Sequence, residues 1–159
     1  LQNSVHPGMS WNWRGGRKFT KIEFGQNTAA DPTPWESADV ENGKAEDGEI
    51  RMHLGSTGCV GDPANGTPIS SCKAPNRLTV TLNGFDPTKQ VVAFDAHALF
   101  NYDIASKAEG DGGCMSGATS AGCAKPFEFL ALDWKADGSG TGLPVAGKTQ
   151  TVLKAVNGQ

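Results

Sequence analysis

Residues 49–59 read EIRMHLGSTGC, a strand pattern that runs directly into a glycine-rich loop ending in a cysteine. The apolar positions 50, 52 and 54 alternate with Arg51 and His53, as in a β-strand with one buried face. This alternation places His53 on the face away from the apolar side chains. A histidine held there is either a metal ligand or a hydrogen-bonded surface group, and the spacing leaves both interpretations open.

Other short segments also carry strand patterns. The alternation is cleanest at residues 77–82 and is also present at 18–24, while residues 149–156 alternate less regularly. Residues 91–95 and 126–134 are apolar on both faces, as strands sandwiched between two layers would be. The chain is therefore expected to consist mainly of short strands.

The four cysteines fall into two local pairs, Cys59 with Cys72 and Cys114 with Cys123. Each pair can form a disulfide across a glycine-rich loop, or all four can bind zinc, although neither spacing matches that of zinc knuckles. Disulfides are the favoured interpretation. A bridge between the first pair closes a loop of about 14 residues, worth about 3 kcal/mol in the chain-entropy model. Disulfides imply an oxidising compartment, so we expect a periplasmic or secreted protein.

Glycine and proline account for 21 and 9 of the 159 residues, which favours loops and turns over long helices. Residues 96–108 could contain a helical turn or two. We therefore expect an all-β fold, an antiparallel β-sandwich with long, disulfide-tied loops. No repeat or linker divides residues 1–159, which are predicted to form a single domain. Because the sequence starts at Leu1, shortly before an aromatic cluster, we expect an N-terminal portion to be missing.

Composition and missing motifs exclude several classes. The 37% hydrophobic and 19% charged residues are typical of a globular domain. A net charge of -3 without a basic stripe argues against a nucleic-acid partner, and no stretch reaches the ~18 apolar residues of a membrane span. Hydrolase, phosphate-loop and dinucleotide signatures are absent, since Gly138-Ser139-Gly140 is only a turn pattern. We therefore do not expect an enzyme.

Histidine, methionine and tryptophan gather near the start of the chain, at His6, Met9, Trp11 and Trp13. In an extended chain the two tryptophans project from the same face. They are either large core aromatics or part of a soft metal site, because imidazole and thioether groups suit copper better than calcium. For His97, a structural or exposed role competes with a role as a ligand.

A calcium-stabilised sandwich is a further alternative. Its motivation is four aspartates near predicted turns, whose hard oxygen ligands suit that ion; they are Asp62, Asp86, Asp95 and Asp103. The spacing is not that of an EF-hand, and these acids could equally cap turns. A disulfide-stapled structural or adhesion module, with the tryptophans in its core, is the alternative without any metal.

Several strings resemble one family when they are taken together and in order. They are HLGSTGCVGDP at 53–63, Cys72 with PNR at 75–77, GFDP at 84–87, and GGCMS at 112–116 with Cys123. GMSWNW at 8–13, with Phe19, is similar to the family's aromatic strand. The chain resembles the four-cysteine MbnP family, also called the metallo-mystery pair proteins, which is related to the methanotroph copper proteins CorA and MopE.

The resemblance implies an extracytoplasmic β-sandwich that binds copper for sequestration or delivery. It also implies a tryptophan oxidised to kynurenine by a partner di-haem enzyme of the MbnH type, similar to cytochrome c peroxidases. Carried over to this sequence, His53 is the first metal ligand, and Trp13, ahead of Trp11, is the kynurenine candidate. The chain departs from copper-binding relatives in having no histidine two residues from the modified tryptophan. His97 or the more distant His6 would supply the second nitrogen, and Met9 a sulfur.

Overall fold

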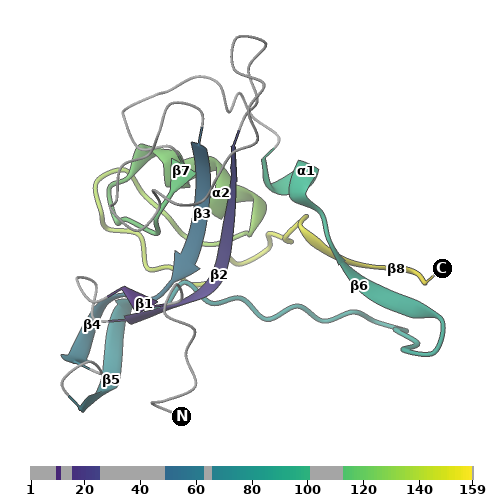
Figure 1. Cartoon of the computed structure of the whole chain (residues 1–159), viewed down its shortest axis with the longest axis horizontal. Coiled ribbons are helices and arrows are strands. Elements are labelled where there is room, and N and C mark those ends of the chain that lie inside the picture. The colour runs from purple at the N-terminus through teal and green to yellow at the C-terminus, as the bar shows by residue number, and fades with distance from the viewer. Residues whose placement is uncertain (1–9, 12–15, 26–48, 63–65, 101–112, 159) are drawn as a thin grey trace, which may run out of the picture.

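The computed structural model describes residues 10–11, 16–25, 49–62, 66–100 and 113–158 (Figure 1). Short strands dominate this part of the chain. They are β1 (Ser10–Trp11), β2 (Gly16–Gly25), β3 (Glu49–Gly55), β4 (Thr57–Asp62), β5 (Thr67–Ala74), β6 (Gln90–Phe94), β7 (Gly113–Cys114) and β8 (Leu153–Asn157). The helical elements are α1 (Ala96–Leu99), the 3₁₀ turn η5 (Ala121–Cys123) and α2 (Ala124–Phe129). The predicted all-β class is confirmed.

The strands form three sheets. The largest has the order β1-β2-β3-β7, whereas β4 pairs with β5 and β6 pairs with β8. All pairs are antiparallel except β3 with β7, which runs parallel through Arg51 opposite Gly113 and Met52 opposite Cys114. Strands predicted at 18–24 and 49–54 are confirmed as β2 and β3, and the helical turn predicted after residue 96 as α1. The last prediction, 149–156, is confirmed only for its second half, in β8.

The apolar face of β3 supplies the centre of the core. Met52 and Leu54 pack with side chains from α1, η5, α2 and the segment before β8. The other buried members are Leu99, Cys114, Cys123, Phe127, Leu130, Leu132 and Val152. Burying a Leu or Phe side chain contributes about 1.5–3 kcal/mol, so this cluster anchors β3 from one side.

The strand predicted at 126–134 is wrong. Residues up to Phe129 belong to the helix α2 instead, because a run that is apolar on both faces has no period to separate strand from helix. Pro126 lies in the first helical turn, where its missing N–H costs no hydrogen bond. Cys123, Phe127 and Leu130 are buried at the helical spacing of four and three residues.

The cleanest predicted strand, 77–82, is also wrong, although its pattern survives. Leu78, Val80 and Leu82 are half-buried, and the residues between them are exposed. The segment nevertheless has no strand partner within the described residues and runs as irregular chain between β5 and β6 (Figure 1). The alternating sequence pattern therefore predicted correctly which side chains are more buried, but a β-strand also needs a neighbouring backbone for hydrogen bonding.

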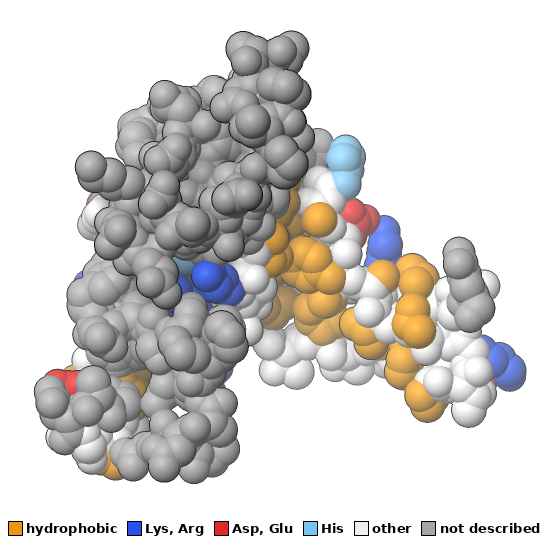
Figure 2. Space-filling view, viewed as in Figure 1, with side chains coloured by type: hydrophobic (Ala, Val, Ile, Leu, Met, Phe, Trp, Pro, Cys, Tyr) orange, Lys and Arg blue, Asp and Glu red, His pale blue; other side chains and the backbone are white. Residues whose placement is uncertain are grey.

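The strand predicted at 91–95 forms as β6, but its two faces are not sandwiched between layers. Val91, Val92 and Phe94 are 52%, 54% and 41% exposed. Together β6 and β8 make a two-stranded ribbon that extends away from the rest of the described chain (Figure 1). Figure 2 shows apolar side chains along its visible face. The prediction of burial on both faces is wrong here, because no other described strand pairs with or covers this ribbon.

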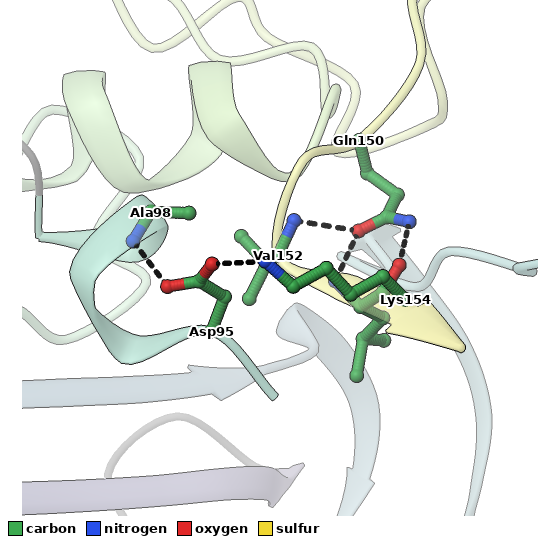
Figure 3. A network of polar contacts seen from close by, with 6 residues as sticks. Asp95, Ala98, Gln150, Val152 and Lys154 are labelled. Atoms are coloured by element: carbon green, nitrogen blue, oxygen red, sulfur yellow. Dashed lines mark hydrogen bonds and ion pairs between the residues drawn. The ribbon is translucent and has the colours of Figure 1, made fainter. Parts of the chain in front are cut away.

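A polar network joins the base of the ribbon to α1 (Figure 3). The Asp95 carboxylate accepts hydrogen bonds from the Ala98 N–H, at 2.9 Å, and from Lys154 Nζ on β8, at 2.6 Å. The Asp95 N–H donates to the Val152 carbonyl at 2.7 Å. Gln150 Oε1 accepts from the N–H groups of Val152 and Leu153. Asp95 thus caps the helix and ties β6 to β8.

The Lys154 hydrogen bond, followed by that of Ala98, holds the pKa of Asp95 below its ordinary value of 3.8. A lowered folded-state pKa gives stability that is complete above the unfolded value and is lost as the pH falls through the folded one. Asp95→Asn keeps an oxygen at the helix cap but removes the charge facing Lys154. We expect the variant to be less stable than the wild type near neutral pH and equally stable once the pH has fallen below the folded-state pKa of Asp95, which itself lies below 3.8. Thermal unfolding across that range measures the difference, and a pH-independent gap would contradict the assignment.

Candidate metal centre

Strand β3 places His53 inside the protein. Its neighbours in the sheet are β2 on one edge and β7 on the other, and residues 51–57 are all buried. Met52 and Leu54 face the core, so alternation turns Arg51 and His53 to the opposite face, as predicted. His53 is only 3% exposed. The interpretation of His53 as a surface group is therefore wrong.

Two cationic residues border the His53 imidazole. Arg51 precedes it by two residues on the same face, and Lys21 lies directly opposite it on β2. The Nδ1 atom of His53 and the Nε atom of Arg51 are both buried. The neutral imidazole is the form that binds a metal ion.

Two polar side chains hold the backbone around His53. Ser116 Oγ donates a hydrogen bond to the His53 carbonyl at 2.7 Å and accepts one from the Gly55 N–H at 3.1 Å. Asn76 Nδ2 donates to the Gly55 carbonyl at 2.8 Å. Sequence reasoning did not assign either residue a role. The strings that carry the family resemblance contain both, which is the one signal that could have singled them out.

The cysteines form the two disulfides that the spacing favoured, Cys59–Cys72 and Cys114–Cys123. The first joins directly opposed residues of β4 and β5. The second closes the segment from β7 to η5 and holds Ser116 close to β3. No free cysteine is left, so the four-cysteine zinc site is wrong. The disulfides are consistent with an extracytoplasmic protein.

The other predicted ligands lie elsewhere or outside the description. Trp11 pairs with Gly16 in the register of β1 and β2, whereas His53 pairs with Lys21. Five residues of β2 therefore separate the two positions, about 16 Å along the strand. His6, Met9 and Trp13 lie outside the described residues, as does Asp103. The structure does not bring Trp11 beside His53.

His97 occupies a different environment from His53. It lies in the last turn of α1, and its side chain is exposed. The nearby Asp95 caps the same helix, and Asp86 holds the Thr88 N–H and hydroxyl at 2.9 and 2.6 Å. Asp86 and Asp95 thus act as turn and helix caps. Within the described residues, no group of three or more His, Cys, Asp or Glu side chains could hold a metal ion.

The chemistry of the centre is therefore that of one buried nitrogen donor on a rigid strand. An imidazole nitrogen fits copper as a ligand, and the described residues contain two imidazoles, the buried one of His53 and the exposed one of His97. The helices of the described chain include none long and apolar enough to span a membrane.

A comparison with protein families and a comparison with solved structures both find similarity to MbnP proteins. A family model for MbnP matches residues 1–116. Among solved structures, MbnP from Methylosinus trichosporium is similar to 99% of this chain, with a TM-score of 0.71 and 28% sequence identity. The chain spans 54% of the length of that solved chain. No curated protein matches the sequence.

Gly113 sets how closely the second disulfide loop approaches β3. It adopts a φ of +121°, and a Cβ at this position would overlap the Arg51 carbonyl oxygen. Gly113→Ala is expected to destabilise the fold by at least about 2 kcal/mol, because it adds a backbone clash to a strained conformation. Chemical denaturation measures the loss.

Gly147→Ala is the matched control, because Gly147 also has a positive φ, +76°, but a Cβ there meets nothing within 4 Å. The control should show only the smaller conformational cost. Equal losses in the two variants would show that close packing on β3 is not what Gly113 provides.

Proposed function

This chain belongs to the MbnP family, and from that premise we propose that it is an extracytoplasmic copper-binding protein. It sequesters or delivers copper in the periplasm or outside the cell and does not itself catalyse a reaction. Copper is the cargo of this protein. The copper chemistry and the choice of His53 as ligand both come from the family resemblance, and the burial of His53 supports that choice.

The observation that supports the proposal most is the burial of His53. A buried imidazole on a strand held at both edges keeps its direction, so a metal ion bound there does not have to order a flexible side chain first. A histidine ligand also suits copper better than the hard ion calcium.

The remaining donors are proposed from the resemblance. A kynurenine at Trp13 or Trp11 offers an arylamine beside a ketone, which is a better donor than an indole nitrogen. His97 is proposed as the second imidazole from the sequence alone, because α1 packs on the Met52 and Leu54 face of β3, whereas His53 faces the other way. The 16 Å between the strand positions of Trp11 and His53 argues against a shared ion for these two. Trp13 keeps the preference that the resemblance gives it.

The proposed oxidation of the tryptophan needs a partner. The chain has no C-x-x-C-H haem attachment motif, so the oxidant is proposed to come from a di-haem MbnH-type enzyme. Oxidation of tryptophan breaks the indole C2–C3 bond and adds two oxygen atoms, a four-electron oxidation for which the partner enzyme is proposed to supply the oxidant. Hydrolysis of the resulting N-formyl group releases one carbon as formate and leaves kynurenine, with one carbon fewer and one oxygen more than tryptophan.

Intact-mass spectrometry tests the modification. Kynurenine is expected to add about four mass units to the native protein, after the loss of hydrogens in both disulfides has been taken into account. Peptide mapping should place the shift on the segment that contains Trp11 and Trp13. Expression without the partner enzyme is the control and should give the unshifted mass. A native protein of unmodified mass would remove the kynurenine from the proposal.

Copper titration tests the ligand. His53→Ala should weaken copper binding at least about 100-fold, because it removes a direct donor, and His53→Asn should do the same while keeping a polar side chain in the buried site. His97→Ala is the comparison: a similar loss would make it the second imidazole, and wild-type affinity would exclude it. Unchanged affinity in both folded His53 variants would contradict the assignment of His53.

The structural or adhesion module remains the second candidate. The exposed apolar residues of β6, Val91, Val92 and Phe94, favour it, because such surfaces commonly mark interaction sites. This candidate predicts that the native protein binds no copper and that both tryptophans are unmodified. The mass and titration measurements therefore also decide between the two functions.

A further inference from the structure

We propose that Ser116 and Asn76 are positioning residues for His53, which set the direction of its imidazole by fixing the peptide groups between His53 and Ser56. The inference rests on the proposed copper function for its consequence, but its geometry is independent of any metal. Both side chains reach the same short stretch of β3 from segments that follow a disulfide-bonded cysteine.

Ser116 takes the place of a strand partner. A parallel neighbour opposite Leu54 would donate to the carbonyl of His53 and accept from the N–H of Gly55. Ser116 Oγ makes those two hydrogen bonds with a single oxygen, at 2.7 and 3.1 Å. β7 pairs with β3 only as far as Cys114. The hydroxyl therefore continues the parallel pairing where β7 has ended.

Asn76 bonds to the other backbone group of Gly55, its carbonyl. Its Nδ2 donates to the Gly55 carbonyl at 2.8 Å, and its Oδ1 packs so closely on Gly142 that a Cβ there would overlap it. Ser56 Oγ also donates to the carbonyl of Pro75, the residue before Asn76, at 2.9 Å. Each of the two segments, the end of β3 and the chain after β5, thus has a side chain that donates a hydrogen bond to the backbone of the other.

The backbone conformations of the two residues support a specific role. Ser116 and Asn76 have φ values of 55° and 52°, in the left-handed region, and are only 1% and 2% exposed. Glycine adopts this conformation at no steric cost, so the conformation alone does not explain a serine or an asparagine. What a glycine would lack is the side-chain hydroxyl or amide that bonds to β3.

The two disulfides place both residues. Ser116 follows Cys114 by two residues, and its N–H donates to the Cys114 sulfur at 3.4 Å. Asn76 follows Cys72, which is bonded to Cys59 on the strand after β3. A shift of the His53 carbonyl rotates its peptide plane and therefore moves the imidazole. The two disulfide-bonded segments therefore fix the orientation of the His53 side chain.

Ser116→Gly is the decisive variant, because it removes the hydroxyl and keeps the left-handed backbone without strain. We expect it to weaken Cu²⁺ binding at least about tenfold, as loss of groups that orient a ligand does, and to change the electron paramagnetic resonance spectrum of the copper-saturated protein. In metal-free protein with isotope-labelled histidine, the ring resonances of His53 should shift or broaden. Asn76→Gly should act in the same direction.

Val152→Ala is the matched control, because Val152 is fully buried in the core and its truncation removes no hydrogen bond to β3. It should lower thermal stability while leaving the copper spectrum and the His53 resonances as in the wild type. The inference is overturned if Ser116→Gly lowers stability but leaves the His53 resonances unchanged in the metal-free protein. A wild type that binds no copper would overturn the proposed function instead, and the resonances would still test the positioning.

Discussion

Residues 51–55 of β3 are buried on both faces, so every donor and acceptor of their backbone has to be paired inside the protein. On one edge β2 pairs along its whole length. On the other edge β7 supplies only two residues, and the Ser116 hydroxyl takes over where it ends. An unpaired buried group would cost about 1–3 kcal/mol, so this edge constrains the loop that carries Ser116.

The loop from Gly113 to Cys123 carries both a glycine and a disulfide that help to complete this edge of the sheet. Gly113 lets the backbone approach Arg51, where any side chain would overlap its carbonyl. The Cys114–Cys123 disulfide holds the loop closed immediately beyond that approach. Gly113 and the second cysteine pair therefore serve one purpose, which is to complete the sheet edge beside His53.

Sequence patterns predicted β3, the face of His53 and both disulfides, because each depends on residues close together in the chain. They failed where the outcome depends on distant partners. Residues 77–82 kept their alternating burial without a strand to pair with, and the apolar run after Ala124 became a helix. The burial of His53, and the reach of Ser116 to a carbonyl 63 residues away, follow from tertiary packing that alternation does not contain.

The central claim is that His53 is a copper ligand held in place by the surrounding fold. An anomalous-difference map at the copper absorption edge, from crystals of the native protein, tests it most directly. The account predicts a copper peak within bonding distance of an imidazole nitrogen of His53, with the other ligands visible around it. A copper peak bound elsewhere, with His53 buried and remote from it, would contradict the account.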